Sequence, residues 1–405
     1  MKKNYLFGML ALAAMTMVGC SNDEVVNDYS QDNAIQFGTY VGRNAESRVA
    51  ETTTTTLQES KEGFGVFATY NQGETTGITP NFMNNQQVTY DEAEWIYSPI
   101  KYWPNNADAE VSFWAYAPYD KENDGTENTA PSFKIHDGID YVAVAELVVE
   151  GKQAVNEKVK FVFDHMMSRI GFKVEAIIDQ LEHEEGDDGE LDETGDNATK
   201  EIAAGTRIVV TNVKLVGALT KEGTMTWTLP TTENKMEKGD WVLETTTTSD
   251  SNTYELKIPN LAANRAWTAG TDENGETIKI TGQNVTTEKA VLNNEESYFM
   301  VVPQENVKLK LTVQYYVITK DDKLDTGYSR VLNTVESDEF EFDFERGHAY
   351  NFVLHLGMTS VKFDAEVSDK WEEGGDYIVN VPINTKNSTT PEEGGQTNTG
   401  GVVNP

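Results

Sequence analysis

Cys20 is the only cysteine in the chain, and its position is suited to the attachment of lipid. Two lysines at the start are followed by a mostly apolar run, Leu6–Val18, which is shorter than the roughly 20 residues that a membrane-spanning helix needs. A basic start, an apolar centre and the small Gly19 are typical of a cleaved export signal. We predict that residues 1–19 are a lipoprotein signal peptide and that lipid on Cys20 anchors the protein. The alternative is an ordinary secretory signal followed by a chance cysteine.

The other residue types that could do chemistry form no catalytic or metal-binding motif. With the single cysteine assigned to lipid, no thiol remains for a disulfide, a thiolate metal site or a nucleophile. P-loop, nucleophile-elbow and dinucleotide-binding motifs are absent, so we predict no enzyme, no cofactor and no metal. A glycosidase carboxylate pair is an alternative that the 67 acidic residues keep open without supporting it. The histidines lack any metal-ligand spacing, and two of them, His165 and His355, are interpreted as structural residues in strands.

The charge of the chain excludes a nucleic acid as partner. Its formal net charge is −35, with 67 acidic residues against 32 basic ones, so a polyanion would be repelled. Eight of the twelve residues from Glu182 to Glu193 are acidic, which indicates a solvated loop. A calcium site there is the alternative, although the EF-hand spacing is missing.

Alternation of apolar and polar residues at period two dominates the chain. From Lys308 to Ile318, for example, Leu309, Leu311 and Val313 share one face and the intervening residues take the other. Many short runs of this kind, separated by turn residues, favour antiparallel β-sandwiches. Further strands are predicted at 34–41, 63–70, 111–117, 169–178, 207–216, 254–258, 297–302 and 348–356. The fold class is therefore all-β.

The predicted domain organisation has two sandwiches. Residues 20–33 form a tether, 34–158 an N-terminal β-sandwich and 159–383 a C-terminal β-sandwich. The join is placed at a polar stretch, 149–158, that precedes a fresh apolar run. Residues 384–405 contain almost nothing to bury, so we predict a disordered polar tail.

Several ordered motifs resemble a known family. The stretches Tyr97–Pro104 (YSPIKYWP) and Val111–Pro118 (VSFWAYAP) resemble a signature of the fimbrillin family of Bacteroidetes. Gly63–Ala68, Phe163–Ile170 and Arg346–Tyr350 are similar to further segments of that family and occur in the same order. Together the matches extend over most of the chain after the signal peptide.

The resemblance implies a pilus subunit with two transthyretin-like β-sandwich domains. It also implies export as a lipoprotein to the outer membrane and the cell surface, where the subunit joins a fimbrium that acts in adhesion. An arginine-specific protease would then remove the first strand, and a strand of the next pilus subunit would fill the groove left behind.

The residues offer a candidate for each part of that route. Ile35, Phe37 and Val41 alternate in the first predicted strand and are expected to plug the groove. Arg48, slightly preferred, and Arg43 lie just beyond this strand and are the predicted cleavage sites. Residues 376–382 could be the donated strand, although the polar tail that follows has little to anchor it.

One reading from another functional class remains open. The protein could be a surface lipoprotein that binds glycans, with aromatic side chains stacking on sugar rings. Tryptophans exposed on one face would favour this alternative, and buried tryptophans would count against it.

Overall fold

The computed structural model describes most of the chain between residues 33 and 390. The described ranges are 33–41, 51–71, 79–106, 110–123, 130–150, 157–176, 206–228, 239–245, 251–258, 266–271, 277–286, 288–294, 297–321, 323–324, 328–357, 361–368, 377–381 and 388–390. Cys20, both candidate cleavage sites (Arg43 and Arg48) and the acidic stretch 182–193 lie outside these ranges.

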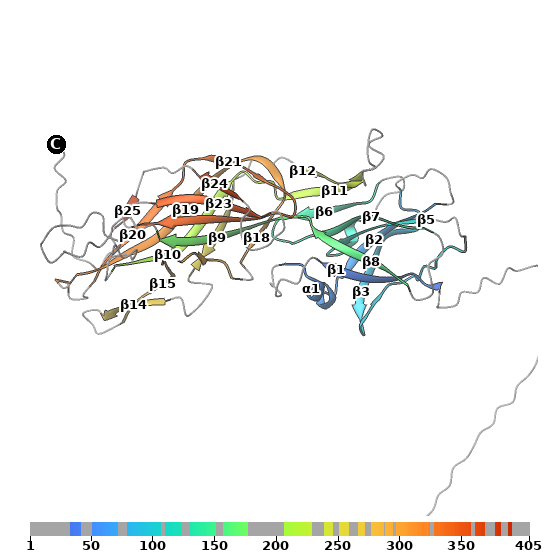
Figure 1. Ribbon diagram of the computed structural model, residues 1–405, viewed down its shortest axis with the longest axis horizontal. Helices are drawn as coiled ribbons and strands as arrows, with labels where there is room; N and C mark the ends of the chain where they lie inside the picture. Colours follow the sequence, from blue (N-terminus) through green and yellow to red (C-terminus); the bar gives the residue numbers. More distant parts are fainter. Residues whose placement is uncertain are drawn as a thin grey trace, which may run out of the picture.

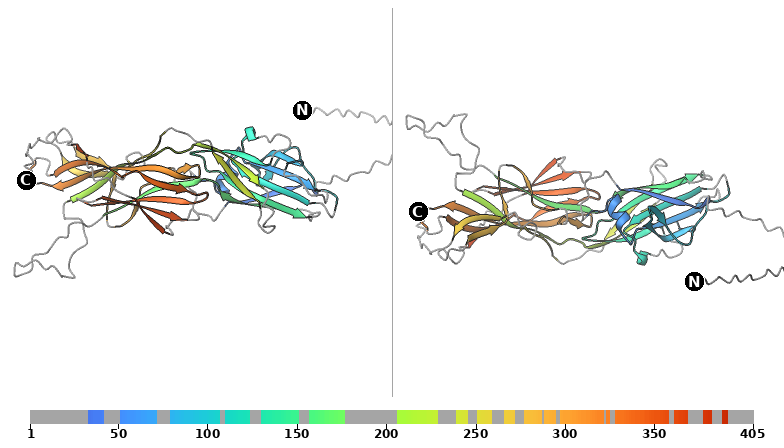
Figure 2. Two further views of the ribbon diagram at one scale, coloured as in Figure 1. Left: turned by 90° about the horizontal axis from the view of Figure 1, so that it is seen from above. Right: turned by 90° about the horizontal axis from the view of Figure 1, so that it is seen from below.

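The described residues form an elongated, almost entirely β structure with two lobes arranged end to end (Figures 1 and 2). One short α-helix, α1 (Thr54–Glu59), begins at the N-cap Thr53 and contributes a single buried side chain, Leu57. A one-turn 3-10 helix covers Lys121–Asn123. No helix in the described ranges is long and apolar enough to cross a membrane. The predicted all-β fold class is confirmed.

The N-terminal lobe is built on a seven-stranded sheet that starts with the first strand of the chain. In spatial order its strands are β1 (Gln36–Val41), β8 (Lys158–His165), β7 (Val142–Glu150), β5 (Glu110–Ala117), β2 (Phe64–Asn71), β3 (Met83–Asp91) and β4 (Glu94–Ile96). The outermost strands, β1 and β4, contact each other, so the sheet curls around the apolar side chains of its inner face. We call these inner side chains the groove core.

A second, three-stranded sheet covers the outer face of β2 and β5. Its strands are, in order, β12 (Asp240–Thr245), β11 (Glu222–Thr228) and β6 (Ser132–His136). Aromatic side chains fill the space between the two sheets: Trp114 on β5 meets Trp227 on β11, with ring centroids 4.9 Å apart. Thus a hairpin from the later half of the chain, β11–β12, completes the N-terminal lobe.

The C-terminal lobe consists of two sheets that pack face to face. One contains β13 (Asn252–Lys257), β10 (Thr206–Gly217), β19 (Gln304–Lys320), β20 (Tyr328–Glu336) and β25 (Ser388–Thr390), with β16 (Gln283–Asn284) on β10 and β21 (Phe340–Phe344) on β19. The other contains β17 (Ala290–Val291), β9 (Ser168–Ala176), β22 (Ala349–Leu356), β23 (Val361–Ser368) and β24 (Tyr377–Val381), with β18 (Phe299–Val301) on β9. Buried side chains of β10 and β19 meet those of β9 and β22 to form the core. A separate hairpin joins β14 (Ala266–Thr271) and β15 (Thr277–Thr281).

The strand pairing differs from the sequence expectation in three respects. Among the described strands, β1–β8 and β9–β22 pair in parallel, where antiparallel pairing was expected. Strands β8 and β11–β12 lie in N-terminal sheets, so the pairing does not follow the predicted join at 158/159. Strand β25 lies within 384–405, where no structure was predicted, because strand pairing uses backbone groups and needs no apolar side chain.

Candidate strand-exchange site

Strand β1 is the outermost strand of the N-terminal sheet, yet its inner side chains are deeply buried. It pairs along one edge with β8 over six consecutive residues, from Gln36 opposite Lys158 to Val41 opposite Phe163. Ile35 and Phe37 are each 1% exposed and Val41 is 3% exposed. Strand alternation explains this, because every second side chain of β1 points into the groove core.

Phe37 is the main anchor of β1. Its ring stacks on Phe161 with centroids 5.5 Å apart and meets Tyr97 at 5.3 Å. Edge-to-face contacts with Phe64 and Phe113, each at 6.2 Å, close the remaining sides. Aromatic pairs at these separations add to the free energy gained by burial, so this position contributes the most to holding the strand.

The second edge of β1 is held mainly at its two ends. At the start, the Ile35 amide donates to the carbonyl of Lys101 at 2.9 Å, and the Trp103 amide donates to the carbonyl of Asn33 at 3.0 Å. At the other end, the Val41 amide donates to Oγ1 of Thr54 at 3.0 Å. No strand is hydrogen-bonded to this edge between these points in the described part of the chain.

Tyr97 connects the fimbrillin-like signature to β1. Its hydroxyl donates to the carbonyl of Ile35 at 2.9 Å. Burial raises the pKa of Tyr97 to about 12, so the hydroxyl stays protonated at physiological pH. Tyr97, Lys101 and Trp103 of the signature therefore hold the start of the first strand by hydrogen bonds.

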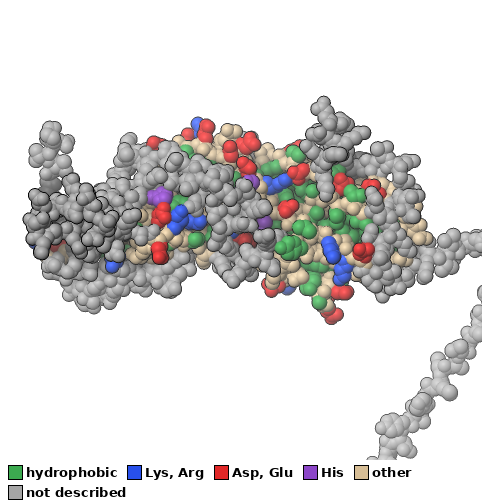
Figure 3. All heavy atoms as spheres, viewed as in Figure 1, with side chains coloured by type: hydrophobic (Ala, Val, Ile, Leu, Met, Phe, Trp, Pro, Cys, Tyr) green, Lys and Arg blue, Asp and Glu red, His purple; other side chains and the backbone are tan. Residues whose placement is uncertain are grey.

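The outer face of β1 and β8 carries exposed apolar side chains. Tyr40 and Val162 are opposite each other across the two strands and are 43% and 57% exposed. Figure 3 shows hydrophobic side chains on the N-terminal lobe, with basic and acidic ones among them. The two faces of β1 thus differ sharply: one is packed in the groove core and the other meets solvent.

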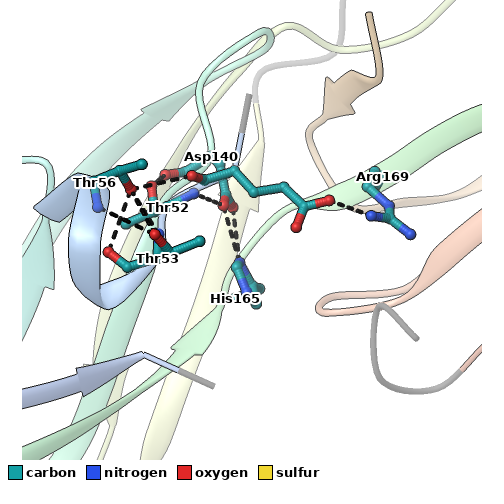
Figure 4. A network of polar contacts seen from close by, with 7 residues as sticks. Thr52, Thr53, Thr56, Asp140, His165 and Arg169 are labelled. Atoms are coloured by element: carbon teal, nitrogen blue, oxygen red, sulfur yellow. Dashed lines mark hydrogen bonds and ion pairs between the residues drawn. The ribbon is translucent and has the colours of Figure 1, made fainter. Parts of the chain in front are cut away.

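A network of polar contacts holds the chain just after the predicted cleavage sites (Figure 4). The Thr52 amide donates to Oδ2 of Asp140 at 2.6 Å, and its hydroxyl donates to the backbone carbonyl of Asp140 at 2.7 Å. Nδ1 of His165, at the end of β8, lies 3.0 Å from the same carboxylate oxygen. Asp140 is only 4% exposed, so it is a buried anchor for the segment that leads into α1.

Glu51 extends the network to the C-terminal lobe. Its carboxylate pairs with the guanidinium of Arg169 on β9, and the two side chains are 6% and 1% exposed. The guanidinium also lies over the ring of Tyr298, 4.6 Å from its centroid. We call Glu51, Thr52, Asp140, His165 and Arg169 the anchor network. It would keep residue 51 in place if the chain were cut before it.

The sequence did not predict the anchor network. The alternation in β9 puts Arg169 on the face opposite Ile170 and Phe172, yet Arg169 is buried against Glu51. Thr52 and Asp140 are 88 positions apart in the chain, and Glu51 and Arg169 are 118 positions apart. No local sequence pattern can signal contacts over such separations. A charged residue inside a predicted strand was the one available hint.

The network makes stability depend on pH. Burial disfavours the charged imidazole of His165, but the adjacent carboxylate of Asp140 outweighs this effect, and the pKa of His165 is raised. A raised pKa means that the contribution is complete below about pH 6.5, the ordinary value for histidine, and is lost as the pH rises through the folded-state value. We expect the stability advantage of the wild type over His165→Gln, measured by urea denaturation, to be constant below about pH 6.5 and to shrink as the pH rises above it.

Asp140→Asn is the matched control for this prediction, since the amide oxygen can still accept from Thr52 but carries no charge. In that background burial still disfavours the charged imidazole and no Asp140 charge offsets it, so the advantage of His165 over Gln should no longer shrink as the pH rises. A wild-type advantage that stays constant over the whole range would contradict the prediction.

The structure gives no support to the glycan-binding alternative. Of the tryptophans whose side chains are described, Trp103, Trp114, Trp227 and Trp241 are buried and Trp95 is half-buried against Phe64. Nor does any group of three His, Cys, Asp or Glu side chains gather as a metal site would require within the described ranges.

Comparisons with known proteins place these features in context. A family model described as fimbrillin-like matches residues 47–274, more than half of the chain. The fimbrium subunit Fim1C of Phocaeicola vulgatus is 25% identical over 412 residues, which cover 92% of this chain and 98% of that protein. A crystal structure of a fimbrial protein from Bacteroides vulgatus ATCC 8482 has a similar fold, with a TM-score of 0.50 and 20% identity over 84% of this chain and 100% of that one.

Proposed function

Because the chain belongs to the fimbrillin-like family, we propose that it is a subunit of a surface fimbria that acts in adhesion and assembles by exchange of its first strand. The family expected from the sequence motifs is confirmed by the family match. The observation that carries the proposal is the position of β1, an outermost strand whose inner side chains fill a core. Such a strand can be replaced by another of similar pattern without rebuilding the sheet.

In the proposed route, the protein is exported with residues 1–19 as signal and is anchored in the outer membrane through lipid on Cys20. An arginine-specific protease cuts after Arg48 or Arg43. The cut frees β1 from the rest of the chain. The anchor network then holds the new N-terminal segment in place at Glu51 and Thr52.

Departure of β1 would leave an unfavourable surface. The edge of β8 would lose its partner, and the slots of Ile35, Phe37 and Val41 would be open to water. Burial of each such side chain stabilises by roughly 1.5–3 kcal/mol, so an empty groove favours capture of a new strand. Because donor and groove are different surfaces, repeated capture builds an open filament of pilus subunits and not a closed ring.

The donor we propose is the segment 376–382. Strand β24 within it pairs only with β23 among the described strands and is outermost in its sheet. An outermost strand near the end of the chain can leave its own sheet with fewer hydrogen bonds broken than a central one. This position supports donation from one subunit to the next.

Digestion of the purified mature protein with an arginine-specific protease tests the proposal. We expect mass spectrometry to locate a cut after Arg48 or Arg43, and gel electrophoresis without boiling to show a ladder of oligomers. The double variant Arg43→Gln/Arg48→Gln is the control and should give neither cut nor ladder. A cut at these arginines without any ladder would contradict assembly by strand exchange.

A further inference from the structure

The inner face of β1 contains one residue that does not suit the groove. Ile35, Phe37, Thr39 and Val41 point inward in turn, and Thr39 lies opposite the buried Phe161 of β8. Three of the four are apolar. The hydroxyl oxygen of Thr39 is buried and has no hydrogen-bond partner among the described residues.

This hydroxyl weakens the fit of β1 at one position. A buried polar atom that loses water without gaining a partner costs free energy, whereas an apolar group of the same shape does not. Valine has the shape of threonine with a methyl group in place of the hydroxyl. A strand with valine at this position would therefore occupy the same groove more favourably than β1 does.

Two strands that compete for one groove are ranked by the positions at which they differ. We propose that position 39 is where the groove discriminates between strands. At this position the groove favours an incoming strand with an aliphatic side chain over β1 of its own chain, which has Thr39. The inference rests on the proposed function, since it describes which strand the vacated groove takes up.

The strand that fits this requirement is β24 of a second copy of the chain. Tyr377, Val379 and Val381 alternate in sequence as the inner residues of β1 do. If the donor keeps the direction of β1, Tyr377 takes the position of Phe37 and Val381 that of Val41. In this register Val379 replaces Thr39. Tyr377 is aromatic, as Phe37 is, and Val381 is the same residue type as Val41. Val379 carries a methyl group where Thr39 has its unpaired hydroxyl.

Substitution of Thr39 tests the first half of the inference without any cleavage. We expect Thr39→Val to raise the urea midpoint of the intact protein above that of the wild type. Thr39→Ser, which keeps the hydroxyl and loses only a methyl group, should not raise it. A Thr39→Val midpoint at or below that of the wild type would overturn the inference.

A peptide of residues 376–382, labelled with a fluorophore, tests the second half on protein cut at its arginines. We expect wild-type protein to bind this peptide about tenfold more tightly than the same peptide with Val379→Thr. Cleaved Thr39→Val protein should take up the peptide about tenfold more slowly, because its own β1 leaves less readily. The Thr39→Ser protein should take up the peptide no more slowly than the wild type, because it keeps the hydroxyl and loses a methyl group.

The outcomes separate the inference from the function on which it rests. Equal affinity of the cleaved wild-type protein for the two peptides would overturn the inference and leave strand exchange intact. Failure of both peptides to bind would overturn strand exchange itself, and with it the selection inferred here.

Discussion

Phe37→Ala is expected to lower the unfolding free energy of the N-terminal lobe by about 3–5 kcal/mol. The ring is 1% exposed and contacts Phe64, Tyr97, Phe113 and Phe161, so its removal leaves a cavity that these rigid rings cannot fill. Urea denaturation followed by tryptophan fluorescence measures the loss, because Trp103 lies in the same core. In the cleaved protein the same variant should release its first strand faster.

Tyr40→Ala provides the control on the same strand. Tyr40 is aromatic, but it points outward and is 43% exposed, so its loss should cost less than about 1 kcal/mol. A similar cost for the two substitutions would mean that β1 is not held by its inner face, and the plug interpretation would fail.

Arg169→Ala is expected to destabilise the protein by about 3–5 kcal/mol, since it leaves the carboxylate of Glu51 buried without its counter-charge. The variant also loses the stacking of the guanidinium on Tyr298. Thermal or urea denaturation of the uncleaved protein measures the effect. The control is Arg346→Ala: Arg346 pairs with Asp240 at 2.8 Å, but both side chains are partly exposed, so the cost should be at most about 1 kcal/mol.

A double-mutant cycle separates the charge from the packing. Glu51→Leu combined with Arg169→Met replaces the ion pair with apolar side chains of similar size. We expect this combination to be more stable than Arg169→Ala, because no uncompensated charge remains. Additive effects of the two substitutions would show that the residues do not act as a pair.

The strands could be predicted from the sequence because period-two alternation is a local signal. The run from Lys308 to Ile318 lies within β19, and the run from 34 to 41 contains β1, with Ile35, Phe37 and Val41 buried as expected. The predicted seat of the first strand rests on these three residues. Their burial is observed, and their role as a removable plug remains a proposal.

Pairing partners could not be predicted in the same way. The alternation of β1 shows which face is buried but not that its neighbour is β8, more than a hundred residues later, or that the two run parallel. The anchor network was missed for the same reason. His165 was interpreted as a structural residue in a strand, and only the fold brings it to Asp140 and Thr52.

The hairpin β11–β12 has a mechanical consequence. Five residue pairs join β11 to β6, and Trp241 on β12 donates its indole N–H to the carbonyl of Val144 on β7 at 3.2 Å. Strands β6 and β11 run roughly along the long axis of the molecule (Figure 1). Tension along that axis therefore loads their hydrogen bonds in shear, where all must break together. In a filament of such subunits, this arrangement would resist extension of each copy under flow.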